Sequence, residues 1–201
     1  MTTAETATTA ETVQGSTTLE AVAPGVRAGT WAIDPAHSEI GFTVRHLMAK
    51  VRGSFREFDG VIEVAPNPAD SRVQVTVQMA SVDTGNAQRD GHLRSNDFLS
   101  IEQFPTMTFV STGIRQTGDQ TFVLAGDLTI KGVTEPVEFT GEFLGVDVDA
   151  YGNTRVGFEA TGQINRKDFG VEGNVPLNGE KMLIGDNVTI QLTVQAVLQD
   201  S

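Results

Sequence analysis

The sequence of 201 residues contains no cysteine. This absence excludes disulfide bonds, thiol catalysis, thiolate zinc sites and iron–sulfur clusters. Positive charge is also scarce, because 14 Lys and Arg residues stand against 26 Asp and Glu residues, which gives a net charge of −12. So acidic a chain lacks the clustered cations that bind nucleic acids, and its net charge disfavours adsorption to anionic membranes. We therefore expect no nucleic acid among its partners.

Long hydrophobic runs are missing as well. No stretch reaches the ~18 consecutive apolar residues that span a bilayer. The chain has no Lys or Arg before Arg27, so the basic region that begins a secretory signal is absent. A membrane-spanning β-barrel would carry aromatic girdles, whereas this chain has one Trp and one Tyr. These observations predict a cytoplasmic protein with no integral membrane span.

Residues 1–28 differ in composition from the rest of the chain. The pentapeptide TTAET at 2–6 recurs at 8–12, and no aromatic residue precedes Trp31. Such a segment, rich in Thr, Ala and Glu, has too little apolar surface to offset the entropy lost on ordering. The composition therefore predicts a disordered N-terminal tail over 1–28 and one folded domain over 29–201.

Beyond the tail, apolar residues recur at every second position. Val73, Val75 and Val77 alternate with Gln and Thr, and the same period runs from Val188 to Ala196. This alternation is typical of strands with one buried face, and it favours antiparallel pairing. We predict about eight strands, near 30–34, 37–46, 51–64, 71–82, 105–116, 121–131, 135–149 and 154–165, with a final strand at 188–199 that closes the sheet. One helical stretch is expected from Asn86 to Leu99, and a structured loop over 166–187.

Turn sequences between the strands indicate hairpins along a meander. A long meander protects its edges best by closing into a barrel. A strand of about eleven residues, tilted by ~40°, gives a barrel roughly 28 Å tall. The eleven phenylalanines carry no polar group and belong in a dry interior. A solid core and a hollow, apolar tunnel agree equally well with this pattern.

Residues that could support catalysis are sparse. His37, His46 and His92 lack the spacing of a zinc-binding helix or finger, and a long-range three-histidine site is the minor alternative. The chain has no nucleophile elbow and no phosphate-binding glycine loop. We therefore predict no metal and no cofactor. The cluster from Asn165 to Gly170 (NRKDFG) places two cations and a carboxylate where a strand leaves the barrel. These charged side chains could contact the polar head group of a ligand, or they could form an ion-paired turn at the surface. Both interpretations stay open.

Several motifs, in order, resemble the YceI-like, polyisoprenoid-binding family. They are WAIDPAHS at 31–38, IGFTVRH at 40–46, GSF at 53–55, FDG at 58–60, RDGHLRSNDFL at 89–99, FP at 104–105, GDLTIKGVT at 126–134 and NRKDFG at 165–170. Each motif is modest evidence, but together they cover nearly the whole chain after the tail. The resemblance implies an all-β fold, namely an antiparallel, eight-stranded, extended lipocalin-like β-barrel with one short helical segment.

The same resemblance implies a non-catalytic protein that binds and carries a long-chain amphiphilic lipid. The candidate ligands are a polyisoprenoid, an isoprenoid quinone precursor or a fatty amide. The head-group site carried over from the motifs is His46, Arg89, His92, Asn165, Arg166 and Asp168. The tunnel wall carried over is Phe42, Leu93, Phe98, Phe109 and Phe169.

Two alternatives from other classes stay open. The first is an isomerase, cyclase or hydrolase for a hydrophobic substrate, with His46 or His92 as general base. The second is a structural or stress protein whose barrel is filled by side chains and binds no ligand. A homodimer is also left open.

Overall fold

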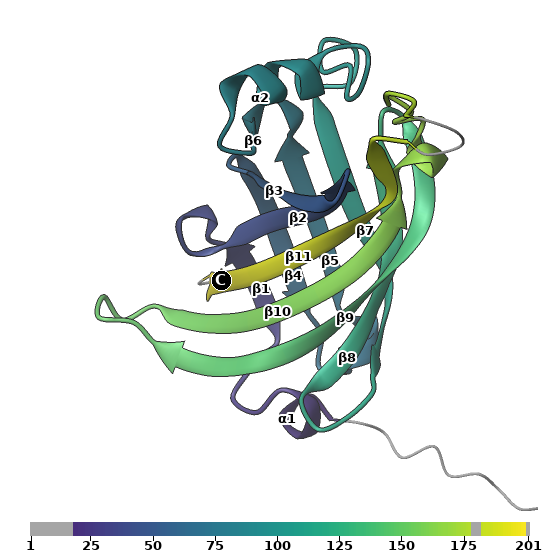
Figure 1. Ribbon diagram of the computed structural model, residues 1–201. Helices are drawn as coiled ribbons and strands as arrows, with labels where there is room; N and C mark the ends of the chain where they lie inside the picture. Colours follow the sequence, from purple (N-terminus) through teal and green to yellow (C-terminus); the bar gives the residue numbers. More distant parts are fainter. Residues whose placement is uncertain (1–17, 178–181, 200–201) are drawn as a thin grey trace, which may run out of the picture.

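The computed structural model describes residues 18–177 and 182–199, and it shows one antiparallel β-sheet that curls into a barrel (Figure 1). Its strands are β1 (Gly29–Ile33), β2 (Glu39–His46), β3 (Ala49–Phe55), β4 (Phe58–Val64), β5 (Arg72–Gln78), β6 (Val82–Asp83), β7 (Thr106–Gln116), β8 (Thr121–Ile130), β9 (Val133–Val148), β10 (Thr154–Asn165) and β11 (Ile184–Leu198). The helices are α1 (Leu19–Val22) and α2 (Ala87–Arg94). The 3-10 turns are η1 (Pro35–His37), η2 (Pro68–Asp70), η3 (Met79–Ser81) and η4 (Arg166–Phe169).

Eight of these strands form a closed ring. They follow the order β1-β4-β5-β7-β8-β9-β10-β11, and the pairing of β1 with β11 closes it. This confirms the predicted antiparallel, eight-stranded barrel. Closure is possible because β11 is long enough to serve two partners on the same edge. Its last residues, Ala196–Leu198, pair with β1, while Ile184–Thr193 pair with β2.

The branch at β11 extends the wall at one end of the barrel. Strands β2, β3 and β6 extend the sheet beyond β11, and α2 follows β6 (Figure 1). The predicted single strand over 51–64 is therefore wrong, because β3 pairs with β2 whereas β4 pairs with β1 and β5. The chain turns at Arg56 and Glu57 between them. Arg94 ties the helix to the wall by donating to the carbonyls of Ala80 and Val82.

Glycines opposite phenylalanines let the wall curve tightly around its interior. A Cβ atom on Gly162 of β10 would lie 2.7 Å from Phe139 Cδ1 of β9. The same close approach joins Gly126 to Phe109, Gly141 to Phe122 and Gly53 to Phe42. Each ring therefore covers a glycine of the neighbouring strand, a pairing that pins register and curvature in strongly bent sheets.

The segment before β1 belongs partly to the folded domain. Val26 is buried in the main core, and the backbone carbonyl of Arg27 accepts a hydrogen bond of 3.0 Å from Trp31 Nε1. Trp31 itself is fully buried. The predicted disorder of residues 1–28 is thus wrong for residues 18–28, since composition cannot reveal one valine that docks into a core. Residues 1–17 lie outside the described residues.

The predicted loop over 166–187 also needs correction at both of its ends. Its first residues form η4, and β11 begins at Ile184, four residues earlier than the predicted start at 188. The register of β11 against β2 shifts between Ile184 and Val188, so this stretch breaks the regular alternation that the sequence pattern requires. Residues 178–181 lie outside the described part. In the described ranges, no helix has the length and apolar character needed to cross a membrane.

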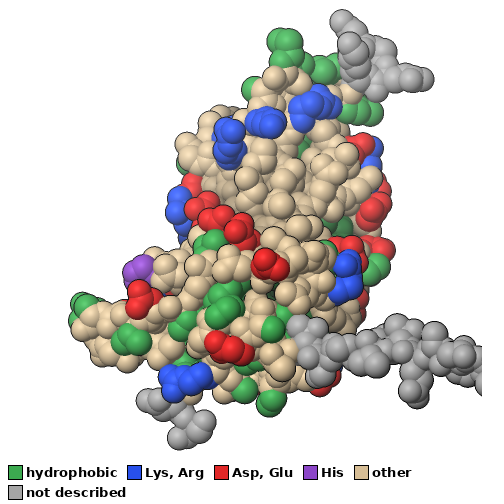
Figure 2. All heavy atoms as spheres, turned by 90° about the horizontal axis from the view of Figure 1, so that it is seen from below, with side chains coloured by type: hydrophobic (Ala, Val, Ile, Leu, Met, Phe, Trp, Pro, Cys, Tyr) green, Lys and Arg blue, Asp and Glu red, His purple; other side chains and the backbone are tan. Residues whose placement is uncertain are grey.

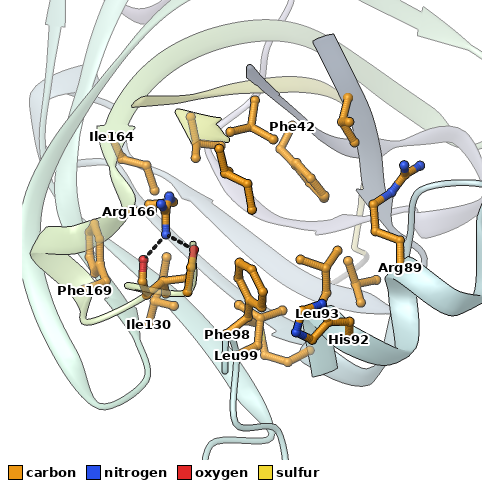
Figure 3. A pocket seen from close by; sticks show the side chains of 18 of the residues that line it. Phe42, Arg89, His92, Leu93, Phe98, Leu99, Ile130, Ile164, Arg166 and Phe169 are labelled. Carbon is orange, nitrogen blue, oxygen red and sulfur yellow. Dashed lines mark hydrogen bonds between the residues drawn. The ribbon is translucent and has the colours of Figure 1, made fainter. Parts of the chain in front are cut away.

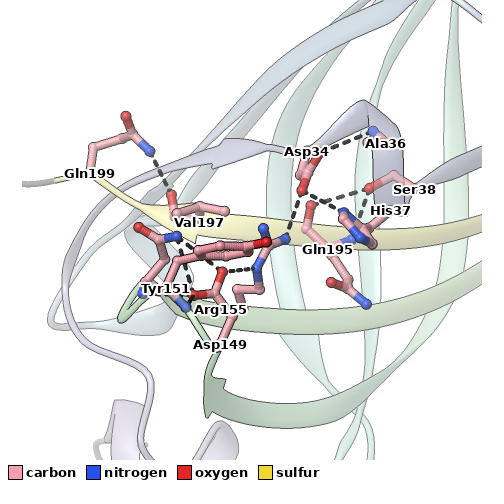
Figure 4. A network of polar contacts seen from close by, with 11 residues as sticks. Asp34, Ala36, His37, Ser38, Asp149, Tyr151, Arg155, Gln195, Val197 and Gln199 are labelled. Atoms are coloured by element: carbon pink, nitrogen blue, oxygen red, sulfur yellow. Dashed lines mark hydrogen bonds and ion pairs between the residues drawn. The ribbon is translucent and has the colours of Figure 1, made fainter.

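A polar network holds the β9–β10 hairpin against β1 and η1 (Figure 4). Arg155 of β10 donates from Nη1 to Asp34 and from Nε to Asp149, both at 2.7 Å. His37 Nδ1 lies 2.8 Å from Asp34 Oδ2. Less than a quarter of each of the Asp34, Asp149 and Arg155 side chains is exposed. The Arg155 hydrogen bonds hold the pKa of both carboxyl groups below their usual value of 3.8.

Replacing Arg155 with Gln is expected to cost stability in a pH-dependent way. A carboxyl group with a lowered folded-state pKa stabilises the protein above its unfolded-state pKa of about 4, and the effect is lost as the pH falls through the folded-state value. The melting temperatures of wild type and R155Q should therefore differ most at neutral pH, and the difference should shrink progressively as the pH falls below about 4. Thermal denaturation followed between pH 7 and pH 2 measures this, with Arg115→Gln as the control. A difference that stays constant down to pH 2 would contradict the assignment.

Candidate functional site

A large apolar cavity occupies the end of the barrel that β2, β3 and α2 extend. Its volume is about 650 Å³, within the range of cavities that enclose a small-molecule ligand. Its wall combines side chains from β2, β3, α2, β11 and η4 with residues 173–175 (Figure 3). Apolar side chains make up most of this wall, and a few charged groups belong to it. The cavity exists because the branch at β11 widens the barrel at this end.

A second, smaller cavity, which we call the lower cavity, lies inside the closed ring. Its volume is about 150 Å³, and every side chain that lines it is apolar. Ile40, Met107 and Ile190 line both cavities. These three residues therefore lie between the large cavity and the smaller one, so the two cavities adjoin there. The interior is not filled by side chains, which argues against the ligand-free, filled barrel.

The fold brings together eight of the eleven site residues proposed from the sequence. Those that line the large cavity are Phe42, His46, Arg89, His92, Leu93, Phe98, Arg166 and Phe169. They come from β2, from α2 and the turn after it, and from η4, so the motifs that carry them converge from distant parts of the chain. Whether each residue contacts a ligand stays a prediction.

The other three residues lie elsewhere. Phe109 lines the lower cavity, where its ring meets that of Phe139 edge to face at 5.6 Å. The Asn165 side chain caps η4 by accepting a hydrogen bond from the Lys167 backbone N–H. Asp168 is exposed and does not line the cavity. Asn165 therefore caps the turn η4, and Asp168 lies within it. Neither side chain belongs to the cavity wall.

Arg166 directs its hydrogen bonds to the protein itself. The side chain is buried, and its guanidinium donates to the carbonyls of Val171, Gly173 and Gly185. Two of these bonds are drawn in Figure 3. Asp186 accepts a fourth at 3.3 Å. Burial lowers the pKa of the guanidinium, and the Asp186 carboxylate counters part of that effect. Arg166 thus braces the cavity wall, a role that its position in a polar motif did not reveal.

Arg89 lies on the opposite side of the cavity, on α2 (Figure 3). Its Nε donates to Thr84 Oγ1 at 2.8 Å and its Nη2 to the Thr84 carbonyl at 3.0 Å. Within the described residues, its Nη1 forms no hydrogen bond. Asp90, the next residue, is buried and accepts hydrogen bonds from the backbone and side chain of Thr84. Thr84 therefore holds the Arg89 guanidinium through Nε and Nη2. The Nη1 group stays available as a hydrogen-bond donor to a ligand.

His92 and His46 mark two edges of the cavity mouth. His92 Nε2 lies 3.0 Å from Asp97 Oδ2, and more than half of each side chain is exposed. The His92 ring also meets Phe98 edge to face at 5.0 Å. His46 is the last residue of β2, and its ring forms no hydrogen bond with the part of the chain that the structure describes. Nowhere in that part do three His, Asp or Glu side chains gather in a group that could hold a metal ion.

Much of the aliphatic wall lies outside the set of site residues predicted from the sequence. Ile40 and Val44 line the cavity with Phe42 and His46 because alternate residues of β2 face the same side. Strand parity alone could have identified these two. Met79 of η3, Val82 of β6 and Met107 of β7 also line the cavity, and only the tertiary arrangement brings these elements to it.

Comparison with known proteins places this site in context. A family model described as a YceI-like domain matches residues 31–196. Protein YceI of Escherichia coli O157:H7 is 41% identical over 151 residues, which are 74% of this chain and 78% of that protein. Two solved structures share the fold. BcnA of Burkholderia cenocepacia has a TM-score of 0.70 at 24% identity, covering 81% of this chain and 98% of its own.

The second solved structure is a polyisoprenoid binding domain from Saccharophagus degradans implicated in plant cell wall breakdown. It has a TM-score of 0.65 at 14% identity, with 86% of this chain and 100% of that domain covered. At this level of identity the likeness concerns the fold alone.

Proposed function

Because the chain belongs to the YceI-like family, we propose that it binds one long-chain amphiphilic lipid, of which a polyisoprenoid is the leading candidate. The apolar chain would occupy the barrel interior, and the polar end would stay at the mouth. The observation that carries the proposal is the pair of apolar cavities that share Ile40, Met107 and Ile190. A long, thin hydrocarbon suits two adjoining apolar spaces better than a compact ligand does.

Burial of the lipid chain would supply the affinity. Apolar surface removed from water contributes roughly 25 cal/mol per Å², before the costs of association are subtracted. The lower cavity offers no polar side chain to a ligand, so only the hydrocarbon part can enter it. The name of the Saccharophagus degradans domain supports a polyisoprenoid as the chain. A quinone precursor or a fatty amide meets the same physical requirements.

The polar end of the ligand would lie near Arg89, His46 and His92. Arg89 keeps hydrogen-bond donors that no described residue uses, and both histidines border the mouth. The cationic Arg89 beside two imidazole rings suits a phosphorylated or hydroxylated head group. Arg166 is assigned to the wall instead, since backbone carbonyls take its donors.

Native mass spectrometry of protein purified without detergent tests this proposal. A bound long-chain species at near one-to-one stoichiometry, identified after solvent extraction, is the expected result. Absence of any bound mass, together with no uptake of added polyprenol, would overturn the proposal. The same spectra report whether the chain forms the homodimer that the sequence left open.

One observation favours an enzyme as the second candidate. His92 and Asp97 form a pair of base and carboxylate within hydrogen-bond distance, and both line the cavity. Such a pair can orient a general base. Both side chains are largely exposed at the rim, however, where a solvent-exposed hydrogen bond without a catalytic role accounts for them equally well. Chemical change of a bound prenyl lipid by wild type, lost in His92→Gln, would favour the enzyme.

Replacing Met107 with Trp is expected to shorten the longest chain that the protein binds. Met107 is buried between the two cavities, and an indole there would close the passage. Each methylene kept out of the lower cavity forfeits about 0.8 kcal/mol, so long polyprenols should lose at least about 10-fold in affinity while short ones bind as before. Titration with a series of polyprenols measures this. Val110→Trp, on an exposed position of the same strand, is the control. Equal losses for all lengths would contradict a continuous passage.

A further inference from the structure

The tip of the β2–β3 hairpin carries apolar side chains where a turn normally carries polar ones. The loop between the two strands consists of Leu47 and Met48. Two-residue hairpin loops favour Gly, Asn or Asp because they need positive φ angles, yet Leu47 adopts φ +54°. Met48 is 94% exposed and Leu47 46% exposed. A strained turn that displays two large apolar groups indicates a function for them.

Two further apolar side chains lie in the segment next to this tip. The Leu47 backbone N–H donates to the Leu183 carbonyl at 2.7 Å, and the Leu183 N–H donates to the Val175 carbonyl at 3.0 Å. Val175 and Met182 are each more than 40% exposed. We call Leu47, Met48, Val175 and Met182 the rim patch. His46, Val175 and Leu183 line the large cavity, so the rim patch borders its mouth.

Cations cover the outer face of the same hairpin. Arg45 lies directly opposite Lys50 in the register, and Arg52 follows on the same face. Like charges directly opposite one another destabilise a strand pair. None of the three cations forms an ion pair with a carboxylate of the described residues. Figure 2 shows Lys and Arg side chains gathered beside hydrophobic ones at the upper edge of a face on which carboxylates are otherwise common.

We propose that the rim patch and the cations Arg45, Lys50 and Arg52 dock the protein on an anionic lipid bilayer, so that a lipid can pass directly between the bilayer and the cavity. Apolar side chains would enter the interface while the cations bind lipid phosphates, which is how peripheral proteins hold anionic membranes. The net charge of −12 disfavours such contact for the molecule as a whole. It would therefore orient the protein with this hairpin toward the membrane.

The geometry favours a bilayer over other occupants of the surface. The contact is a narrow tip anchored by backbone hydrogen bonds to the segment before β11, whereas a protein partner requires a broad, complementary face. The tip also borders the opening through which an insoluble ligand must enter. This inference rests on the proposed lipid binding, because a cavity for a water-soluble ligand would need no bilayer beside it.

Partition onto vesicles tests the docking surface. Wild type should float with vesicles of equimolar phosphatidylcholine and phosphatidylglycerol and bind phosphatidylcholine vesicles weakly. Neutralising Lys50 and Arg52 together (K50Q/R52Q) should weaken partition about 25-fold, at roughly fivefold for each cation. Met48→Asp should weaken it as well. The controls are Arg115→Gln and Tyr151→Asp, a similarly exposed apolar site in the turn after β9, and neither should change partition.

A second assay separates the docking surface from the ligand cavity. A labelled polyprenol is offered either in the anionic vesicles or from ethanol solution, and uptake by the folded variants is compared. M48D and K50Q/R52Q should lose uptake from vesicles and keep uptake from ethanol. Equal partition of wild type onto both vesicle types, or wild-type partition of both variants, would overturn the docking surface. Patch-dependent partition without any polyprenol uptake would support the docking surface and contradict the proposed function.

Discussion

Phe42→Asp is expected to reduce lipid affinity by more than about 100-fold, because it places a carboxylate inside an apolar cavity. Phe42 lies in the middle of β2, lines the large cavity and packs against Phe55 with ring centroids 5.7 Å apart. An unpaired charge next to a bound hydrocarbon costs several kcal/mol, and about 2.7 kcal/mol already corresponds to 100-fold. Isothermal titration with a polyprenol measures the change.

The neighbouring residue supplies a matched control. Thr43 lies on the opposite face of the same strand, where its hydroxyl donates to Gln191 Oε1 at 3.0 Å. Thr43→Asp adds the same charge to the same strand outside the cavity, so its lipid affinity should stay close to that of wild type. Phe42→Leu separates loss of the ring from gain of the charge, and it should bind within about 10-fold of wild type. Unchanged affinity in folded F42D would contradict the placement of the lipid.

Arg166→Ala is expected to lower the free energy of unfolding by about 3–5 kcal/mol, which makes it the most destabilising single change considered. It removes the donor shared by the carbonyls of Val171, Gly173 and Gly185. Each buried carbonyl left without a partner costs about 1–3 kcal/mol. At roughly 2–4 °C per kcal/mol for a chain of this size, the melting temperature should fall by about 10 °C. Differential scanning calorimetry measures the shift.

Lys167→Ala is the matched control for Arg166. Lys167 is the adjacent cation in η4 and pairs with the same carboxylate, Asp186, at 3.0 Å. Its side chain is 43% exposed, and exposed pairs contribute at most about 1 kcal/mol. Arg166→Lys keeps the charge but loses the planar fork that reaches several carbonyls at once, so its melting temperature should lie between the two. Equal melting temperatures for R166A and K167A would show that Arg166 does not brace the wall.

The fold class could be predicted from the sequence because the relevant signal is local. Alternation such as Val73, Val75 and Val77 fixes which face of a strand is buried, whatever strand lies beside it. The start of helix α2 was likewise predictable, since Asn86 is an N-cap residue whose side chain accepts from the Arg89 backbone N–H. The predicted end at Leu99 is wrong, because the helix ends at Arg94 and turns follow it. The division at Arg56 and Glu57 was not predictable, because only the different partners of β3 and β4 separate the two strands.

The candidate site was likewise predictable only in part. The motifs identified residues that line the large cavity, such as Phe42 and Phe169, because side-chain type and strand parity already indicate an inward, apolar position. They could not distinguish Arg89, which keeps free donors, from Arg166, which braces the wall. The partners of Arg166 are backbone carbonyls, which every residue possesses, so no sequence pattern marks them.

By itself, the sequence determined a cysteine-free, acidic, antiparallel barrel with a phenylalanine-rich interior, because composition and a two-residue period are properties of the chain alone. The tertiary structure decided that the barrel is hollow and that β11 branches. It also decided that Val26 docks into the core and that the rim patch lies beside the cations of the β2–β3 hairpin. These features depend on which segments meet across the chain. The hydrogen bonds and cavity walls involved form between segments that are distant in the sequence, so no local sequence pattern predicts them.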